Sequence, residues 1–437
     1  MRDKIFELIE RERTRQEETL ELIPSENYAS AAVREAVGSV MMNKYAEGQA
    51  GARYYQGNEI ADEVERECGR RALAAFGLSE DEWGVNVQAL SGSPANLAVY
   101  NGLLTPGDKI MSMYLPDGGH LSHGWELPGK KISIVSKIWK VEQYKTDPKT
   151  RLFDYEAVKK QAEEFGPKII VSGGTAYPRE INYQAMGKIA DSVRAFYLAD
   201  VAHEAGLIAA GVCKSPFEAA DVVTMTTHKT LRGPRGALIF SRRGIVDKID
   251  FSVFPGIQGG PHLHTIAGIA VALGEVATEE FKAYAKQVVK NARVLAAELL
   301  GAGFDVVSGG TDKHLVLVDL RNKGMSGWVL AWALEAAGIV VNRNTVPLET
   351  ASPFYPSGIR LGTPAVTTRG MAEPEMKQIA GWLVRVTKMA HKWQLPKEAK
   401  EKKEFVREFM DEVWEEAELQ KIKGEVRELC GEFPLKN

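Results

Sequence analysis

From Gly84 to Arg242 the sequence alternates short apolar segments with longer amphipathic ones, and this alternation restricts the fold more than any other feature of the chain. The apolar segments predict strands, and their dense Val, Ile and Leu content is typical of strands buried on both faces. Strands that alternate with helices form a mostly parallel sheet with helices covering it. We therefore expect an α/β domain whose ligands gather at the carboxyl ends of the strands.

The expected elements divide the chain into parts. Strands are expected at 84–88, 109–113, 132–135, 168–172, 196–202, 222–227 and 236–241, and helices at 3–19, 94–104, 155–165 and 181–195. After a long helix at 265–300 the pattern becomes an α+β set, with strands at 314–320, 339–342 and 359–363 and helices at 326–338, 373–393 and 397–429. We expect an N-terminal arm at 1–50, a large domain at 51–270 and a small C-terminal domain at 271–437.

Composition excludes several classes of function. The chain has 437 residues, 44% hydrophobic and 26% charged, and a net charge of −3, which gives no electrostatic reason to expect nucleic acid or anionic membrane as a partner. Its three cysteines, Cys68, Cys213 and Cys430, form neither a disulfide framework nor a metal-ligand pattern. The N-terminus is too charged for a signal peptide, and no apolar run is long enough to span a bilayer. We expect a cytoplasmic protein.

One lysine, Lys229, follows an apolar, β-branched strand and precedes a Gly-Pro turn edged by arginines. Burial and nearby positive charge both lower the pKa of such a lysine. A neutral amine in this setting suits Schiff-base chemistry. Lysines after strands are more often simply solvated, so the segment needs a second observation.

Asp200 supplies that observation, because the strand at 196–202 delivers it to the carboxyl end of the predicted sheet. Pyridoxal phosphate requires a carboxylate that keeps its ring nitrogen protonated and a lysine that holds its aldehyde. The alternative is an aspartate that only caps the next turn. Upstream, Ser91-Gly92-Ser93 precedes a helix whose free N–H groups could bind the phosphate, although plain helix capping is the commoner use of such a turn.

Histidines in a glycine-rich turn give a further option. His120 could stack on a cofactor ring, or could only bond nearby backbone. A zinc cluster of His120, His123, His262 and His264 has no cysteine or acidic partner at a recognised spacing, so no metal is expected.

Eight motifs, in this order, closely resemble the serine hydroxymethyltransferase (glycine hydroxymethyltransferase) family of fold-type I pyridoxal phosphate enzymes. They are Leu22–Tyr28, Asn43–Gly48, Arg53–Tyr55, Ser91–Ser93, Gly118–Leu121, Asp200–His203, Thr227–Arg235 and Ser357–Pro364. The resemblance runs from Glu21 to the end of the small domain. It implies a large domain like that of aspartate aminotransferase, with a mostly parallel sheet, and a smaller α+β C-terminal domain.

The resemblance also implies roles for individual residues. The catalytic residues would be Lys229, Glu47, His120, Asp200 and Tyr55. The residues that bind the cofactor would be Ser91, Gly92, Ser93, His120, Thr175, Asp200, His203, Lys229, Tyr45 and Arg235. The substrate would be bound by Ser25, Arg360, Glu47 and Tyr55, and the reduced pteridine by Leu115, Gly119, Leu121, Ser352, Pro353 and Phe354. Tyr45 and Tyr55 would reach the site of a neighbouring subunit, which implies a homodimer with shared sites.

The implied activity is reversible transfer of a hydroxymethyl one-carbon unit between serine and tetrahydrofolate, giving glycine, through a pyridoxal phosphate Schiff base. Asp117 stands where the family commonly has histidine, near the expected pteridine contacts, and leaves a tetrahydromethanopterin-type carrier open. A pteridine-independent aldolase acting on threonine-like 3-hydroxy amino acids is the alternative among enzymes. A catalytically silent binding protein, for example one that binds RNA, is disfavoured by the near-neutral charge and the intact Lys229.

Overall fold

The computed structural model describes residues 3–127 and 129–435. The chain divides into two compact units, one of Tyr28–Lys286 and the other of Met1–Asn27 together with Gln287–Asn437. These limits differ from the expected division at 50 and 270. The first 27 residues group with the C-terminal part of the chain, because their backbone pairs with it.

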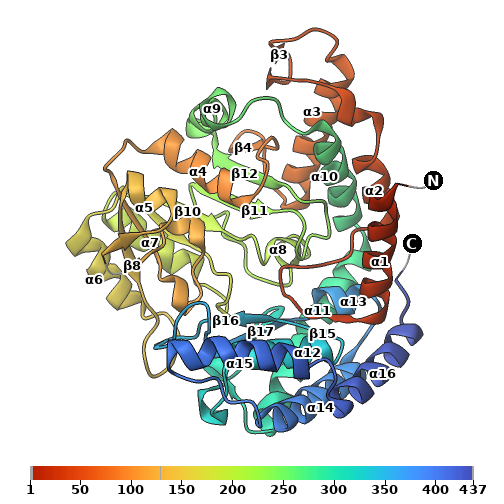
Figure 1. The fold of residues 1–437 in the computed structure, drawn as a ribbon. Helices are drawn as coiled ribbons and strands as arrows, with labels where there is room; N and C mark the ends of the chain where they lie inside the picture. Colours follow the sequence, from red (N-terminus) through yellow and green to blue (C-terminus); the bar gives the residue numbers. More distant parts are fainter. Residues whose placement is uncertain (1–2, 128, 436–437) are drawn as a thin grey trace. The chain divides into compact units, whose positions relative to one another are not determined.

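The unit Tyr28–Lys286 is built on a sheet that, in the described residues, has seven strands in the order β4-β12-β11-β10-β9-β5-β8 (Figure 1). These strands are β4 Trp83–Asn86, β5 Lys109–Met113, β8 Lys140–Tyr144, β9 Ile169–Ser172, β10 Phe196–Asp200, β11 Val222–Thr226 and β12 Ala237–Arg242. Only β12 runs against its neighbours in this sheet, and the other described pairings are parallel. The mostly parallel α/β sheet expected from the sequence is confirmed.

Helices and short hairpins complete this unit. The helices are α2 Ala31–Val37, α3 Glu59–Ala75, α4 Gly92–Leu103, α5 Ile134–Ile138, α6 Tyr155–Phe165, α7 Tyr183–Ser192, α8 Ala205–Ala209, α9 Val246–Phe251 and α10 Leu263–Val276, and the hairpin strands are β2 Gly48–Gln49, β3 Ala52–Arg53, β6 Glu126–Leu127 and β7 Lys130–Lys131. Helix α4 packs on β11 and β12, and α7 packs on β9 and β10. A buried cluster that includes Val99, Ile169 and Leu198 forms the core between α4 and the sheet.

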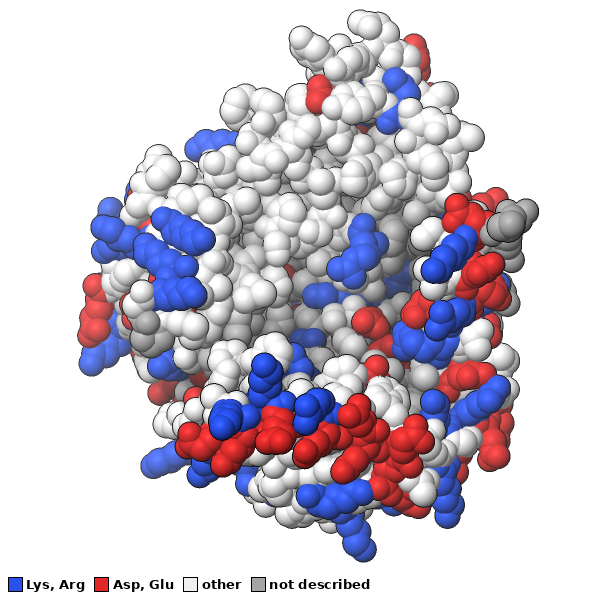
Figure 2. All heavy atoms as spheres, viewed as in Figure 1, with Lys and Arg blue, Asp and Glu red and all other residues white. Residues whose placement is uncertain are grey.

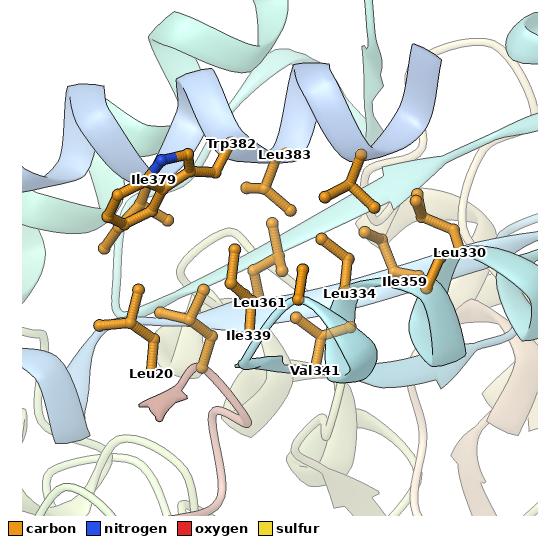
Figure 3. Close-up of a cluster of buried hydrophobic side chains, with 14 of the residues drawn as sticks. Leu20, Leu330, Leu334, Ile339, Val341, Ile359, Leu361, Ile379, Trp382 and Leu383 are labelled. Carbon is orange, nitrogen blue, oxygen red and sulfur yellow. The ribbon is translucent and has the colours of Figure 1, made fainter. Parts of the chain in front are cut away.

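The second unit holds a sheet that, in the described residues, has four strands in the order β13-β14-β17-β16, all antiparallel. The strands are β1 Leu20–Glu21, β13 Asp305–Val306, β14 Leu315–Asp319, β15 Ile339–Val340, β16 Asn342–Asn344 and β17 Gly358–Gly362, and the helices are α1 Lys4–Glu18, α12 Gly327–Ala336, α13 Pro364–Thr368, α14 Glu373–Ala390, α15 Ala399–Glu412 and α16 Ala417–Glu432. Helix α11 Glu279–Gly301 belongs to both units. Figure 3 shows Ile379, Trp382 and Leu383 facing Leu361 and Ile339 in the core of this unit.

The N-terminal segment is part of this second unit through backbone pairing and one arginine. Strand β1 runs parallel to β15, with Leu20 opposite Ile339, and Leu20 is fully buried. The guanidinium of Arg369 donates to backbone carbonyls in the last turns of α1 and α16, where the helix dipoles favour positive charge. Residues 3–27 are therefore held by contacts with distant segments, which no local sequence pattern predicts.

Three sequence predictions of secondary structure are wrong. The expected strand at 132–135 is instead the start of α5, where the Ser133 hydroxyl accepts a hydrogen bond from the Ser136 backbone (3.3 Å) and caps the helix. The expected single helix at 265–300 breaks between α10 and α11, where Thr278 caps the second helix at Phe281 (3.2 Å). The expected helix at 397–429 is likewise two helices, α15 and α16. None of the helices in the described ranges has the length and apolar character needed to cross a membrane.

Candidate active site

Asp200 is the last residue of β10, and its carboxylate is held by three donors. Its Oδ2 accepts from Asn96 Nδ2 (2.8 Å) and lies 3.0 Å from His123 Nε2, and its Oδ1 accepts from the Ala202 backbone (3.1 Å). Burial by itself would raise the pKa of Asp200, but the hydrogen bond from His123, the positive charge of His123 and His120, and the bond from Asn96 hold it well below its usual range. The group is therefore a fixed, buried anion at the carboxyl end of the parallel strands, as the sequence predicts.

Asn96 is a residue of this site that the sequence reasoning missed. It lies on the first turns of α4 and is fully buried. Its Oδ1 accepts from the Thr224 hydroxyl on β11 (2.7 Å), and its Nδ2 donates both to Asp200 and to the Ser122 hydroxyl (2.9 Å). Its place four residues after the tight Ser91-Gly92 turn is the signal that could have found it.

The two histidines of the glycine-rich loop both lie beside Asp200. His120 Nδ1 lies 2.7 Å from the Ser122 hydroxyl, and its ring is 5.6 Å from that of His123. Ligand atoms of His120, His123 and Asp200 lie within 4.8 Å of one another. His262 and His264, the other members of the zinc cluster weighed from the sequence, stack on each other at 5.6 Å.

Lys229 lies in a tight turn directly after β11 and is largely buried. The turn is closed by hydrogen bonds from Gly233 N to the Thr227 carbonyl (2.7 Å) and from Arg232 N to the Lys229 carbonyl (3.1 Å). The neighbouring imidazole of His228 has its pKa lowered to about 3, first by burial and then by the charges of Lys229 and Arg235. Lys229 and His228 therefore lie in a largely buried turn, and Arg235 adds positive charge beside them.

The start of α4 leaves backbone N–H groups without a side-chain cap. Ser91 is the N-terminal cap residue of α4, but its side chain makes no capping hydrogen bond. A Cβ at Gly92 would lie 2.8 Å from the Thr226 methyl at the end of β11, so glycine lets the helix start approach the sheet closely. The hydroxyls of Ser91 and Ser93 and the first N–H groups of α4 thus fit a phosphate.

The loop that carries His120 is held by hydrogen bonds from Thr175, which follows β9. The Thr175 hydroxyl donates to the Gly119 carbonyl (2.9 Å), and the Thr175 backbone donates to the Gly118 carbonyl (2.7 Å). His203, three residues after Asp200, is buried, and its carbonyl accepts from the Thr230 hydroxyl (2.9 Å), next to Lys229. These contacts bring the loops after β5, β9, β10 and β11 together at one edge of the sheet.

Tyr45, Glu47 and Tyr55 form a separate cluster. The Tyr45 hydroxyl donates to Glu47 Oε1 (3.1 Å), which raises the pKa of Tyr45, and the Tyr45 and Tyr55 rings pack edge to face at 5.2 Å. Both tyrosines are exposed. Ideal Cβ positions at Gly259 and Gly260 lie 3.2 Å from Glu47 Oε1 and 3.5 Å from the Tyr45 ring, so the glycine-rich segment lies directly beside this cluster.

Leu115, the exposed Leu121 and the exposed Arg235 lie in the unit Tyr28–Lys286, whereas Arg360, Ser25 and Ser352–Phe354 belong to the other unit. Arg360 is buried on β17, its Nε donates to Asn342 Oδ1 on β16 (3.0 Å), and burial lowers its pKa to about 10. Ser25 follows Pro24, which packs against Gly362 at the end of the same strand. The segment Ser352–Phe354 is exposed, and Arg343 lies over the Phe354 ring at 4.7 Å.

Comparisons with known proteins identify the family. The chain matches the family model described as serine hydroxymethyltransferase over residues 1–383. A probable cytosolic serine hydroxymethyltransferase of Schizosaccharomyces pombe is 48% identical over 447 residues, which cover 99% of this chain and 95% of the relative. A mitochondrial serine hydroxymethyltransferase of Kluyveromyces lactis is 46% identical over 449 residues, covering 99% of this chain and 90% of the relative. With nearly the whole chain aligned at this identity, the protein belongs to the serine hydroxymethyltransferase family.

Proposed function

We propose that this protein transfers a hydroxymethyl one-carbon unit reversibly between serine and tetrahydrofolate, with glycine as the other product. The observation that carries the proposal is the joint presence, in a chain of this family, of a buried lysine after β11 and an ionised aspartate at the end of β10. Enzymes of this family depend on pyridoxal phosphate. When bound, this cofactor takes up the negative charge that develops on the substrate carbon.

The residues present fit the cofactor. Asp200, ionised and held by three donors, would bind the protonated ring nitrogen, and Lys229 would hold the aldehyde. Ser91, Gly92 and Ser93 at the uncapped start of α4 would bind the phosphate. We assign the ring face to His120 and further contacts to Thr175, His203, Tyr45 and Arg235. Lys229 is largely buried beside Asp200's strand end, and a lysine acts on an aldehyde through its free amine.

Substrate binding is assigned to Arg360 and Ser25. A guanidinium can bind a carboxylate with two parallel hydrogen bonds, and the buried Arg360 would regain solvation of its charge from that anion. Glu47 is assigned the proton transfer at the hydroxymethyl oxygen or the pteridine nitrogen, with Tyr55 beside it. The hydrogen bond from the Tyr45 hydroxyl orients the Glu47 carboxylate for that task.

Tetrahydrofolate is the proposed carrier. Asp117, which stands where the family commonly has histidine and so left the identity of the pteridine undecided, is buried. Its Oδ2 accepts from both the backbone (2.8 Å) and the hydroxyl (3.0 Å) of Thr146. Its carboxylate is therefore occupied inside the loop, and it offers no new charge to a pteridine. We assign the carrier contacts to Leu115, Gly119 and Leu121, and to Ser352, Pro353 and Phe354.

We further propose a homodimer with shared sites. Apolar side chains gather on the segment that carries Tyr45 and Glu47, with Val40 79% and Tyr54 77% exposed. Figure 2 shows few charged side chains over this part of the molecule, around β3. An exposed apolar area of this kind favours burial against a second copy. Sedimentation that shows an active monomer would contradict the dimer.

The relatives include both cytosolic and mitochondrial proteins. We propose the cytoplasm, and we expect no nucleic acid or membrane partner. The three cysteines are all free and buried, which suits a reducing compartment. Cell fractionation followed by immunodetection would test the assignment.

The function is tested by absorption spectra of the purified protein with glycine, before and after addition of tetrahydrofolate. We expect glycine to induce a long-wavelength band that rises sharply with tetrahydrofolate. A band that ignores tetrahydrofolate would favour another pteridine or the aldolase. The variant Lys229→Ala should lose the spectrum of the covalently bound cofactor, whereas Lys188→Ala, which changes an exposed lysine on α7, should keep it.

A further inference from the structure

We infer that His123 is a positioning residue for Asp200, acting together with Asn96 to orient the carboxylate toward the ring nitrogen of the cofactor. The inference rests on the proposed function, because it assumes that Asp200 binds that nitrogen. The sequence motifs assigned no catalytic or cofactor-binding role to His123 or Asn96.

The first argument is how the hydrogen bonds are distributed over the two carboxylate oxygens. Oδ2 of Asp200 is engaged by both Asn96 (2.8 Å) and His123 (3.0 Å), whereas Oδ1 accepts from the Ala202 backbone (3.1 Å). A carboxylate oxygen has two lone-pair sites, so the described bonds fill Oδ2 and leave Oδ1 able to accept a further donor. Asn96 and His123 therefore fix the plane of the carboxylate and leave Oδ1 as the oxygen that can accept from the cofactor.

The second argument concerns the direction of each bond. The hydroxyl of Thr224 donates to Asn96 Oδ1 (2.7 Å), which forces the amide nitrogen of Asn96 to face Asp200 and Ser122. Ser122 accepts from that amide, and its own proton is then available to His120 Nδ1 (2.7 Å). The buried Asn96 amide thus links Asp200, assigned to the ring nitrogen, with His120, assigned to the ring face, through the Ser122 hydroxyl.

The third argument is the placement of His123 itself. The side chain is 1% exposed, and the described bond of its ring is the one from Nε2 to Asp200. Its Nδ1 is buried and has no hydrogen-bond partner among the described residues. An apolar ring would fill the same space without leaving a polar atom unsatisfied, so packing alone does not account for histidine here. The Nε2 proton directed at Asp200 does account for it.

A metal ion is a poor explanation of the same cluster, although ligand atoms of His120, His123 and Asp200 come within 4.8 Å. The Asn96 amide directs an N–H group at the same Asp200 oxygen that His123 engages. An N–H donor repels a cation at that oxygen and stabilises a carboxylate that accepts hydrogen bonds.

The test uses pyridoxal phosphate labelled with ¹⁵N in the ring, bound to the full-length protein. The ¹⁵N chemical shift reports whether the ring nitrogen is protonated, which a merely structural role of His123 would not move. His123→Phe keeps the ring volume and removes the donor. Glutamine can place an amide N–H where histidine has Nε2–H, whereas the shorter asparagine cannot, so His123→Gln and His123→Asn form a pair of similar polarity.

We expect the shift in His123→Phe and His123→Asn to move toward the neutral ring, with the cofactor Kd raised about tenfold, the size of one lost charge-assisted hydrogen bond. His123→Gln should restore both readouts. Tyr100→Phe is the matched control, because it removes a buried hydroxyl of α4 that has no partner among the described residues.

Three outcomes separate the hypotheses. A wild-type protein that does not bind the labelled cofactor would overturn the proposed function. Wild-type binding with an unchanged ¹⁵N shift in folded His123→Phe would overturn only the role of His123. If His123→Phe does not fold, equal shifts in the glutamine and asparagine variants would overturn it in the same way.

Discussion

Arg53 in one compact unit and Arg360 in the other both have buried side chains, yet their pKa values are shifted in opposite directions. In Tyr28–Lys286, Arg53 is 4% exposed at its side chain and pairs with Asp62 (2.7 Å) and Glu65. It also donates to the backbone carbonyls of Ala46 and Gly48. Burial alone would lower the pKa of Arg53, but the hydrogen bonds to Glu65 and Asp62 outweigh it and raise that pKa.

In the other unit, Arg360 is buried on β17 with Asn342 as an acceptor at Nε, and burial lowers its pKa. The difference separates two uses of a buried charge. Arg53 has its charge compensated by carboxylates of the same chain, and it fixes the loop that carries Tyr45 and Glu47. The pKa of Arg360 is lowered by burial, so an anion bound beside its guanidinium would offset part of that burial cost.

The largest expected effect is on stability, from Arg53→Met. Removing the cation takes from the largely buried Asp62 and Glu65 the ion-pair partner that they share, which should lower the free energy of unfolding by about 3–5 kcal/mol. Urea unfolding followed by circular dichroism measures it. Replacing all three charged residues with apolar ones should recover most of the loss, and a triple variant as unstable as the single one would contradict this account.

The next effect is on activity, from Arg360→Met. Loss of the guanidinium should reduce kcat/KM for serine about a hundredfold, as expected for truncating one partner of a buried charge pair. The free energy of unfolding should fall less than in Arg53→Met, because the loss of hydrogen bonds is offset by the removal of a buried charge. Arg360→Lys should rescue activity poorly, since an ammonium lacks the two-pronged geometry. A large fall in the stability of Arg360→Met together with normal activity would show that Arg360, like Arg53, serves the fold and not substrate binding.

A smaller effect is predicted in the pH dependence of stability. Burial acts to raise the pKa of Asp62, but hydrogen bonds from Arg53 and the Gly51 backbone lower it overall. The unfolded state therefore binds more protons than the folded state in acid, so the free energy of unfolding should fall as pH drops below about 4. Urea midpoints measured across this range should show a shallower acid loss in Arg53→Met. Parallel pH curves for the two proteins would disprove the assignment to Asp62.

The smallest effect is expected from Arg70→Gln. Arg70 pairs with Glu67 at 2.7 Å on α3, but both side chains are exposed. Solvent screens such a pair, so the urea midpoint should not shift measurably. A shift comparable to that of Arg53→Met would show that burial is not what distinguishes the two arginines.

Much of the α/β unit could be predicted from local pattern. Helix α6 coincides with the expected range 155–165, because Asp154 caps its start and Gly166 ends it in a left-handed conformation. The expected strand at 132–135 failed, because a short apolar run does not by itself distinguish a strand from a helix. The strand β8 was missed, since its alternating Lys140–Tyr144 segment has too few apolar residues to stand out.

The candidate site likewise contains residues that could be predicted from the sequence and residues that could not. Lys229 and Asp200 follow apolar strands, and their side chains carry recognisable chemistry, so both could be named from the sequence. Asn96 and His123 could not, because what marks them is their contact with Asp200, which lies 104 and 77 residues away in the sequence. Asp117 is the opposite case. Its departure from the family pattern is visible in the sequence, but its carboxylate only accepts hydrogen bonds from Thr146 within the fold.

The sequence by itself determined the family and the mostly parallel sheet, and it singled out Lys229 as the candidate lysine, because motif order and hydrophobic periodicity are properties of neighbouring residues. Only the tertiary structure decided which side chains hold Asp200, that Asp62 and Glu65 pair with Arg53, and that Leu20 pairs with Ile339. These features depend on hydrogen bonds and burial between distant segments, whose free energy exists only once the chain has closed on itself.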